Sequence, residues 1–228
     1  VGFFMQTLDG TIVNTALPAM ATSLGESPLR LQAVVVAYML TMAALIPASG
    51  WLADRFGSQR VFLSAIVLFS AGSAACALSN DLSQLIAARV LQGLGAAVLL
   101  PVGRLVILQH FPREELLSAM SFVAIPGLIG PLIGPTLGGW LVETASWHWI
   151  FLINLPVGLV GALATMRYMP NLKRADAGRF DLAGYAMLVL AMIAISLALD
   201  GLGGLGWAST LVVLLMVAGL AALTAYWL

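Results

Sequence analysis

Two ionisable side chains, Asp9 and Arg89, lie deep inside long apolar stretches of the sequence. A charged side chain at the middle of a membrane-spanning helix costs about 2.5–3.5 kcal/mol, so each needs a partner or a water-filled cavity. A carboxylate that is partly desolvated and also close to a guanidinium can take up and release protons near neutral pH. The two residues therefore indicate proton or cation coupling across a membrane. A static ion pair that locks two helices together is the alternative.

The depth of the two residues leaves open whether they touch. At 1.5 Å per residue, Asp9 lies roughly 22 Å from the outer end of its segment, and Arg89 lies roughly 10–12 Å from the outer end of its own. An error of three residues in a boundary moves either position by about 4–5 Å. We therefore expect both residues to line one central cavity, and whether their side chains touch stays undecided.

A second polar face lies on the first segment, nearly opposite Asp9. Thr7, Thr11 and Asn14 gather there, because successive helical residues turn by about 100°. One face should contact the cavity and the other a neighbouring helix, and the sequence does not say which. For Asn14, and for Asn154 further along the chain, a hydrogen bond between helices is the simpler explanation. A place in the cavity is the alternative for Asn14.

The composition indicates that membrane helices carry these residues. Hydrophobic residues make up 61% of the 228 positions and charged residues 9%, with a mean hydropathy of +1.02. A soluble domain has roughly 45–50% apolar and about 25% charged residues. Lipid must therefore face much of the chain, and the net charge of zero argues against a nucleic-acid partner.

Eight segments are apolar and long enough to span a bilayer, which takes about 20 residues. No connector between them is long enough for a soluble domain. We therefore predict an all-α polytopic membrane protein, and we expect a fragment of a longer one because both ends lie inside apolar segments. The predicted spans are 1–23, 32–53, 61–79, 82–103, 117–141, 148–168, 182–200 and 207–228, with 201–206 as the last connector.

Lysine and arginine are distributed unevenly between the connectors. Those after the second, fourth and sixth spans, with their flanks, hold eight such residues, and the opposite connectors hold only Arg30. Basic residues in short loops favour the cytoplasmic side. We therefore predict a multi-pass protein of a bacterial inner membrane with its N-terminus in the cytoplasm. The eight residues are Arg55, Arg60, Arg104, Arg113, Arg167, Lys173, Arg174 and Arg179.

The connector after the second span reads Gly50-Trp-Leu-Ala-Asp54-Arg55-Phe-Gly57-Ser-Gln-Arg60. Its glycine at 57 permits a tight turn. The run resembles the loop signature of the major facilitator superfamily, G-x-L-A-D-R-x-G-R-K/R. Ser58 and Gln59 replace basic residues of that signature, which weakens any charge relay through the loop. The resemblance implies a cytoplasmic gating loop made of Gly50, Asp54, Arg55, Gly57 and Arg60.

The fourth span contains Leu85-Ile-Ala-Ala-Arg89-Val-Leu-Gln92-Gly93-Leu-Gly95-Ala-Ala97. This run is similar to the L-x-x-x-R-x-x-Q-G-x-G-A-A element of the same superfamily at every defined position. The resemblance implies a role for Arg89 in proton transfer and places Gln92 in the same site. Gly93 and Gly95 are better explained by close approach between helices than by binding.

The fifth span contains Gly130-Pro-Leu-Ile-Gly134-Pro135-Thr-Leu-Gly138-Gly139, which resembles the G-x-x-x-G-P-x-x-G-G element of the antiporter branch. Small residues four apart form a stripe for tight helix contact, and proline bends a helix. We interpret the element as a seal between two halves of a transporter. Part of the stripe should then be exposed here, because its partner would lie in the other half. Ordinary packing inside the first bundle is the alternative.

The first span reads Leu8-Asp9-Gly-Thr-Ile-Val-Asn14-Thr-Ala-Leu-Pro18, which resembles the fourteen-span drug/proton antiporters. Residues 2–6 and 145–156 resemble multidrug resistance carriers of that branch. In this branch two extra helices join two six-helix halves. The resemblance implies a six-helix transport bundle at 1–170, a cytoplasmic connector at 171–181, and two linker helices at 182–228, the second cut short. The C-terminal half would be a partner of this chain.

The resemblance implies a secondary transporter that exports drug-like or amphipathic small molecules in exchange for protons by alternating access. An exporter of an endogenous metabolite or organic anion would share these motifs. An uptake symporter is disfavoured by the element at 130–139. An enzyme is the weakest alternative, since His110 and His148 should lie on opposite membrane sides and cannot share a metal or catalytic cluster. We therefore predict no cofactor and no metal, with protons, a small molecule and the lipid bilayer as partners.

Overall fold

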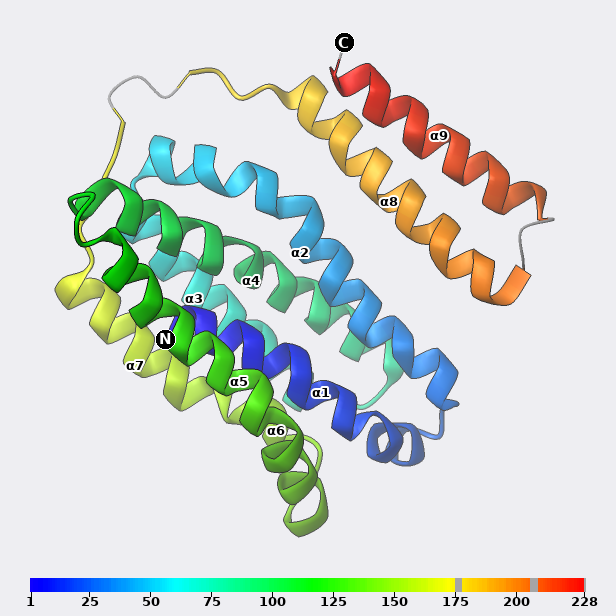
Figure 1. Cartoon of the computed structure of the whole chain (residues 1–228). Helices are drawn as coiled ribbons and strands as arrows, with labels where there is room; N and C mark the ends of the chain where they lie inside the picture. Colours follow the sequence, from blue (N-terminus) through cyan, green and yellow to red (C-terminus); the bar gives the residue numbers. More distant parts are fainter. Residues whose placement is uncertain (175–177, 206–208, 228) are drawn as a thin grey trace. The chain divides into compact units, whose positions relative to one another are not determined.

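The computed structural model describes residues 1–174, 178–205 and 209–227, and every regular element in this part of the chain is a helix. The predicted all-α fold is therefore confirmed. In chain order (Figure 1) the helices are α1 (Gly2–Leu24), α2 (Pro28–Phe56), α3 (Ser58–Ala77), α4 (Leu82–His110), α5 (Leu116–Thr144), α6 (Trp149–Leu152), α7 (Asn154–Tyr168), α8 (Leu182–Leu205) and α9 (Thr210–Trp227).

Each of the eight predicted spans coincides with a helix, and the sixth is divided into α6 and α7 at Ile153. Several of the helices, such as α2 and α4, extend beyond the predicted spans. Among the described residues, six segments are long and apolar enough to cross a membrane. The apolar part of α9, Thr210–Thr224, is shorter, and α1, which carries Asp9 and several threonines, is not one of the six. The six are α2, α3, α4, α5, Trp149–Tyr168 and Leu182–Leu199.

The seventh span is longer than predicted. We expected it to end at residue 200, before a glycine-rich connector, but α8 continues to Leu205. In lipid an unpaired backbone amide costs several kcal/mol, which exceeds the penalty of about 1 kcal/mol for a glycine inside a helix. The rest of the expected connector, residue 206, and the start of the last span, 207–208, lie outside the described residues.

The contacts divide the chain into two units, Val1–Ala175 and Asp176–Leu228. In the second unit, α8 and α9 pack against each other in antiparallel orientation. A Cβ at Gly219 of α9 would lie 3.1 Å from the carbonyl oxygen of Ala191 in α8. Asp181 caps the start of α8, where its carboxylate accepts a hydrogen bond of 2.9 Å from the amide of Gly184.

Within the first unit, α4 is the central helix. Half of its most apolar window is buried, the largest share among the six candidate spans. Glycines allow α3 to approach it closely: a Cβ at Gly72 would lie 2.5 Å from the backbone nitrogen of Gln92, and a Cβ at Gly95 would lie 2.5 Å from that of Phe69. A Cβ at Gly93 would lie 3.0 Å from the Tyr38 carbonyl on the other side, in α2. The interpretation of Gly93 and Gly95 as packing residues is thus supported by their contacts.

Candidate functional site

Asp9 of α1 and Arg89 of α4 form an ion pair in the interior of the first unit. Arg89 Nη1 lies 2.5 Å from Asp9 Oδ2. The exposed fraction of the Asp9 side chain is 0% and that of Arg89 is 1%. The sequence left the contact between them undecided, and the structure shows that they touch.

Asp9 accepts two further hydrogen bonds through its other oxygen. Gln92 Nε2 donates to Oδ1 at 2.8 Å, and Asn154 Nδ2 donates to the same atom at 3.3 Å. Three donors therefore surround one carboxylate, which is the arrangement that suits an ionised group, because a carboxylate only accepts hydrogen bonds. The charge is compensated although no water reaches it.

Ser73 of α3 lies behind these amides and connects them. Its Oγ accepts from Gln92 Nε2 at 3.0 Å and from Asn154 Nδ2 at 2.9 Å, and it donates to the Phe151 carbonyl at 3.2 Å. Gln92 Oε1 in turn lies 3.8 Å from the buried thiol of Cys76. We call the five hydrogen-bonded residues the Asp9 cluster: Asp9, Ser73, Arg89, Gln92 and Asn154.

The remaining contacts of Arg89 come from α2, α4 and α6. Its Nη1 donates to Gln92 Oε1 at 2.7 Å, and its Nε donates to the Val34 carbonyl at 3.4 Å. The guanidinium carbon lies 4.0 Å from the centre of the Tyr38 ring and 5.9 Å from that of Phe151. Both distances fall within the range of about 6 Å at which a ring face attracts a cation.

The local structure explains why these side chains meet. Arg89 and Gln92 are three residues apart on α4 and therefore share one face of it. Asn154 is the first residue of α7, directly after Ile153 interrupts the helix. On the opposite side, a Cβ at Gly72 would meet the backbone of Gln92, so the glycine brings Ser73 close to the cluster.

The sequence predicts a hydrogen bond between helices for Asn154 and for Asn14, and the outcomes of the two predictions differ. Asn154 is buried and bonds to α1 and α3, so the expected bond between helices is confirmed. Asn14 is exposed, and its amide donates at 3.2 Å to Gly10 of its own helix, so the same expectation is wrong there. Asn14 lies on the face of α1 turned away from Asp9, and the structure does not bring it into the Asp9 cluster.

Ser73 and Tyr38 were not predicted as site residues. Both lie in apolar helices and both are buried. Serine in a membrane helix often bonds to its own backbone, and a tyrosine near a helix end often marks the interface, so neither type draws attention alone. A polar side chain in α3 at the level of Gln92 was the available signal for Ser73.

The predicted gating loop is mostly helical: Gly50, Asp54 and Arg55 lie in α2, Arg60 lies in α3, and Gly57 forms the turn between the two helices. Gly57 has a φ of 95°, a conformation that favours glycine, and Asn171 packs against it. Asp54 pairs with Arg174 at 3.7 Å, and its carbonyl accepts from the Arg174 amide. Gly50 is half-buried with open space around its Cα, and two further members of the predicted loop are exposed, Arg55 and Arg60.

Of the two residues that depart from the loop signature, Ser58 bonds to the segment after α7 and Gln59 bonds to α7 itself. Ser58 Oγ donates to the Pro170 carbonyl at 3.0 Å and accepts from the Leu172 amide at 2.9 Å. The Ser58 amide also donates to the Leu172 carbonyl at 2.8 Å. Gln59 Nε2 reaches the backbone of Thr165 at 3.1 Å. Neutral hydrogen bonds thus hold 170–174, which we call the strap, across the α2–α3 turn.

The glycine element of α5 does not behave as expected. Gly130, Gly134 and Gly138 are all buried and pack on Thr7, Thr11 and Thr15 of α1, respectively. The two helices run parallel with the same four-residue spacing, so the stripes match. The expectation that part of the stripe is exposed is therefore wrong, and the alternative of packing inside the first bundle is correct. Pro135 is exposed, and Gly139 is half-buried with nothing close to its Cα.

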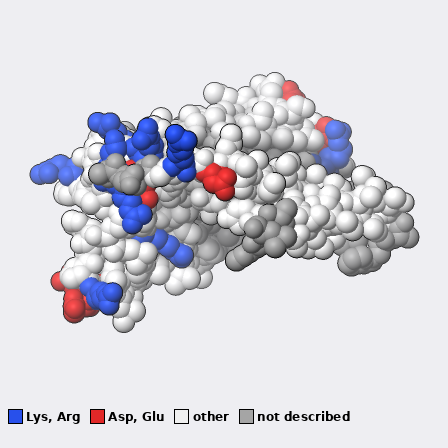
Figure 2. Space-filling model, turned by 90° about the horizontal axis from the view of Figure 1, so that it is seen from above, with Lys and Arg blue, Asp and Glu red and all other residues white. Residues whose placement is uncertain are grey.

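Figure 2 shows most of the Lys and Arg side chains of the visible face close together, on the left of the view. The α2–α3 turn, the end of α4 and the strap lie at the same end of the bundle, because α2 and α4 run parallel: Val34 contacts Arg89, and Thr41 contacts Gly93. The uneven distribution of charge that the sequence predicts is thus present in three dimensions.

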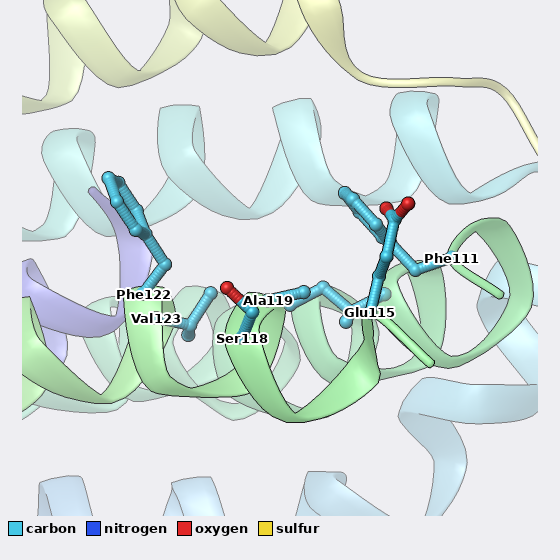
Figure 3. Close-up of a pocket in the computed structure, with 7 residues that line it drawn as sticks. Phe111, Glu115, Ser118, Ala119, Phe122 and Val123 are labelled. Carbon is cyan, nitrogen blue, oxygen red and sulfur yellow. The ribbon is translucent and has the colours of Figure 1, made fainter. Parts of the chain in front are cut away.

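A separate groove lies where α4 ends and α5 begins. Its volume is about 460 Å³, and the side chains of Phe111, Glu115 and Phe122 project to the same side in Figure 3. None of the residues predicted for the site lines it. The lining residues are Ile107, Phe111, Glu115, Ser118, Ala119, Phe122 and Val123.

Comparisons with known proteins agree with this architecture. The family model described as Major Facilitator Superfamily matches residues 1–181. A protein described as "Putative multidrug resistance protein MdtD" from Serratia proteamaculans (strain 568) is 60% identical over 99% of this chain and 47% of its own length. Proteins of the same description from Yersinia enterocolitica and Yersinia pestis are each 59% identical over 99% of the chain and 48% of theirs. The chain thus spans about half the length of these relatives.

Solved structures with similar folds are also transporters. The chain aligns with an auto-inhibited POT family peptide transporter at a TM-score of 0.63, with 18% identity over 99% of this chain and 51% of that one. It aligns with a bacterial homologue of the human lysosomal transporter Spinster at a TM-score of 0.59, with 17% identity over 99% and 58% of the two chains. At these identities the likeness shows the fold alone.

Proposed function

This chain belongs to the major facilitator superfamily, and from that premise we propose that its complete protein exports small molecules in exchange for protons by alternating access. The relatives that carry multidrug resistance in their description support drug-like or amphipathic compounds as the exported class. The family consists of membrane transporters and not of enzymes. This chain would supply one six-helix bundle at 1–170 and the linker helices at 182–228, joined by the connector at 171–181.

The observation that carries the proposal is the buried pair of Asp9 and Arg89. The only other polar groups of the Asp9 cluster are neutral, so keeping two charges buried there is expensive unless they have a task or bond perfectly. Asp9 is the acidic member of the Asp9 cluster and the group that can change its charge by accepting a proton. We assign the transported proton to Asp9 and the tuning of its charge to Arg89 and Gln92.

Burial also supports a link between protonation and movement. With 0% exposure, Asp9 has no path to water in this conformation, so a proton can reach it only after neighbouring helices separate. Once Asp9 is neutral, Arg89 loses the partner at 2.5 Å and becomes a buried charge in need of compensation. Protonation therefore favours a different arrangement of α1 and α4, which is the requirement for alternating access.

The energy of one proton is sufficient for export. Moving one charge across 100 mV is worth about 2.3 kcal/mol, which corresponds to roughly a 50-fold gradient at about 1.4 kcal/mol per tenfold. One proton per neutral substrate molecule therefore gives useful efflux. In the orientation that the basic residues favour, with the N-terminus in the cytoplasm of a bacterial inner membrane, the proton moves inward while the substrate leaves.

The two remaining sequence elements receive roles as positioning devices. We assign the α2–α3 turn, held by the strap, to control of the cytoplasmic opening. We assign the glycines of α5 to the tight contact with α1, so that α5 follows α1 when the Asp9 cluster rearranges. Asn14 is exposed on α1, which leaves it available to a cavity shared with the second half.

Two rivals differ in what is carried and in which direction. An exporter of an endogenous metabolite or organic anion would use the same Asp9 cluster, and it would transport its anion rather than amphipathic compounds. An uptake symporter would accumulate substrate on the cytoplasmic side when the outside is acidic.

Transport by the full-length protein in everted membrane vesicles tests the proposal. A panel of lipophilic cations, neutral drugs and organic anions would be offered, with a proton gradient imposed and then dissipated. We expect uptake of amphipathic compounds into everted vesicles that stops when the gradient collapses, and that is absent from the Asp9→Asn variant. Gradient-driven transport by Asp9→Asn at the wild-type rate would refute the role of Asp9, and transport in the opposite direction would favour the symporter.

A further inference from the structure

The aromatic ring beside Arg89 is a feature that the proton site does not yet explain. Tyr38 of α2 is 2% exposed, and the centre of its ring lies 4.0 Å from the guanidinium carbon of Arg89. Its hydroxyl has no hydrogen-bond partner in the described part of the chain. The contact with Arg89 is therefore made by the face of the ring and not by the hydroxyl group.

We propose that Tyr38 is a positioning residue that holds the Arg89 guanidinium inside the bundle while Asp9 is protonated, so that Asp9 can accept a proton without Arg89 leaving the site. The inference rests on the proposed function, in which Asp9 carries the proton. It adds a device that keeps the arginine in place during the half of the cycle in which its carboxylate partner is neutral.

The ring of Tyr38 acts differently on the two charge states of Asp9. The face of an aromatic ring carries negative potential, so it attracts the guanidinium. While Asp9 is charged, its carboxylate also holds Arg89 in place. When Asp9 is neutral, the attraction of the ring is the larger share of what remains, so loss of the ring costs more in that state. Without the ring, Arg89 would keep the oxygens of Gln92 and Val34 as its hydrogen-bond acceptors.

The proton itself also has a place in the cluster. It adds to a carboxylate oxygen of Asp9 and converts an acceptor into a donor. Asn154 Oδ1 has no hydrogen-bond partner in the described residues, and its amide already lies 3.3 Å from Asp9 Oδ1. Rotation of that amide by half a turn presents its oxygen as an acceptor to the new O–H group, and its nitrogen then leaves Asp9 and Ser73.

The charged or titratable groups that face Asp9 come from three helices. They are Arg89 from α4, Tyr38 from α2 and Cys76 from α3. The α7 residue at the site, Asn154, is neutral. A change confined to the ring at position 38 therefore alters one feature in the surroundings of Asp9 and leaves the arginine and the thiol as they are.

The test measures protonation of Asp9 directly in the full-length protein reconstituted in lipid vesicles. The infrared band of protonated carboxyl groups is recorded across pH, and the band of Asp9 is identified by its loss in Asp9→Asn. The variants are Tyr38→Phe, Tyr38→Leu, and phenylalanines with one to three ring fluorines at position 38. Fluorine weakens the negative face of the ring with little change in size, so this series keeps the fold even where Tyr38→Leu does not.

We expect Tyr38→Phe to keep the wild-type midpoint, because it keeps the ring. Tyr38→Leu should lower the midpoint by about one pH unit, a tenfold loss in proton affinity that corresponds to about 1.4 kcal/mol. Each added ring fluorine should lower the midpoint stepwise from that of Tyr38→Phe towards that of Tyr38→Leu. The matched control is Tyr168→Leu, which removes a ring that lies 5.5 Å from the guanidinium carbon of Arg167. Because Tyr168 is 79% exposed and is not part of the Asp9 cluster, this change should not move the midpoint.

A midpoint that is independent of fluorination would overturn the proposal and reduce Tyr38 to a packing residue, even if transport falls. Absence of any carboxyl band that depends on both pH and Asp9 is a different outcome. It would overturn the assignment of the proton to Asp9, and the role of Tyr38 would fall with it.

Discussion

The ion pair between Asp9 and Arg89 allows a quantitative prediction. Their charged groups are in contact at 2.5 Å, which places the charge centres roughly 4 Å apart, where two unit charges attract by about 4 kcal/mol at an effective dielectric constant of about 20. Removing one member of a buried pair typically costs about 3–5 kcal/mol, because the other remains as an uncompensated charge. The pair should therefore act as a unit in stability.

The perturbation is a double-mutant cycle with Asp9→Asn, Arg89→Met and both changes together. Arg89→Met should destabilise most, by about 3–5 kcal/mol, because it leaves a buried carboxylate with only amide donors. Asp9→Asn should cost less, since the asparagine carbonyl still accepts from Arg89. The double variant should be more stable than the sum of the single effects predicts, with a coupling energy of about 2–4 kcal/mol. All three should lose coupled transport.

Cys76 supplies the assay, because its thiol is buried in the same bundle. In the full-length protein with any cysteine elsewhere replaced, reaction of Cys76 with a fluorescent maleimide during heating reports unfolding of the bundle. The matched control is the surface pair of Asp54, which is 24% exposed, and Arg174, which is 72% exposed, at 3.7 Å, for which a cycle should give about 0–1 kcal/mol. A coupling energy for Asp9 and Arg89 no larger than that of the control would refute the reasoning.

Three other contacts can be tested by single substitutions. Gly134→Ala should reduce transport because the new Cβ meets Thr11 Oγ1. Thr11→Ala in the same chain removes that oxygen and should restore part of the transport rate; no restoration would contradict the α1–α5 contact. Ser58→Ala should release the strap, at a cost of about 1–3 kcal/mol for the buried groups left unpaired, and hydrogen exchange at Leu172 should accelerate while that at Leu85 does not. Burial lowers the pKa of His148 below 6.5, so the folded state disfavours the charged ring and the free energy of unfolding falls as the pH drops below 6.5 towards the folded pKa. Between pH 7.5 and 5 the melting temperature of the wild type should therefore fall more than that of His148→Gln, and equal decreases would contradict this.

The sequence predicted the helices well because the bilayer imposes their length. A stretch of about 20 apolar residues has few alternatives in lipid, so the spans were found even where prolines interrupt them. The error at α8 came from treating glycines as loop residues, a rule that holds in water and fails where backbone groups must bond internally. Arg89 was predicted inside the bundle for the same reason, since lipid offers a guanidinium no partner.

The partners of each helix face could not be predicted. Helical periodicity placed Asp9 and Asn14 on opposite sides of α1, but it gave no information on which neighbour covers which side, and Asn14 was misjudged. The glycine stripe of α5 was assigned to the second half because its spacing is equally suited to any small-residue surface. The glycine stripe packs on the threonines of α1. Their four-residue spacing was visible in the sequence, but the sequence did not show that α5 is the helix that covers them. Ser73 and Tyr38 were missed because their contacts cross between helices far apart in sequence.

The Asp9 cluster also has a consequence for how the bundle assembles. It contains one polar residue from α1, one from α3, two from α4 and one from α7, all bonded at a single level of an otherwise apolar interior. A slip of α4 by one residue would turn Arg89 and Gln92 by about 100° and leave several groups unpaired in lipid, each at a cost of several kcal/mol. Apolar helices packed through glycine and alanine have many nearly equivalent alignments, and this one polar level selects a single register for four helices at once.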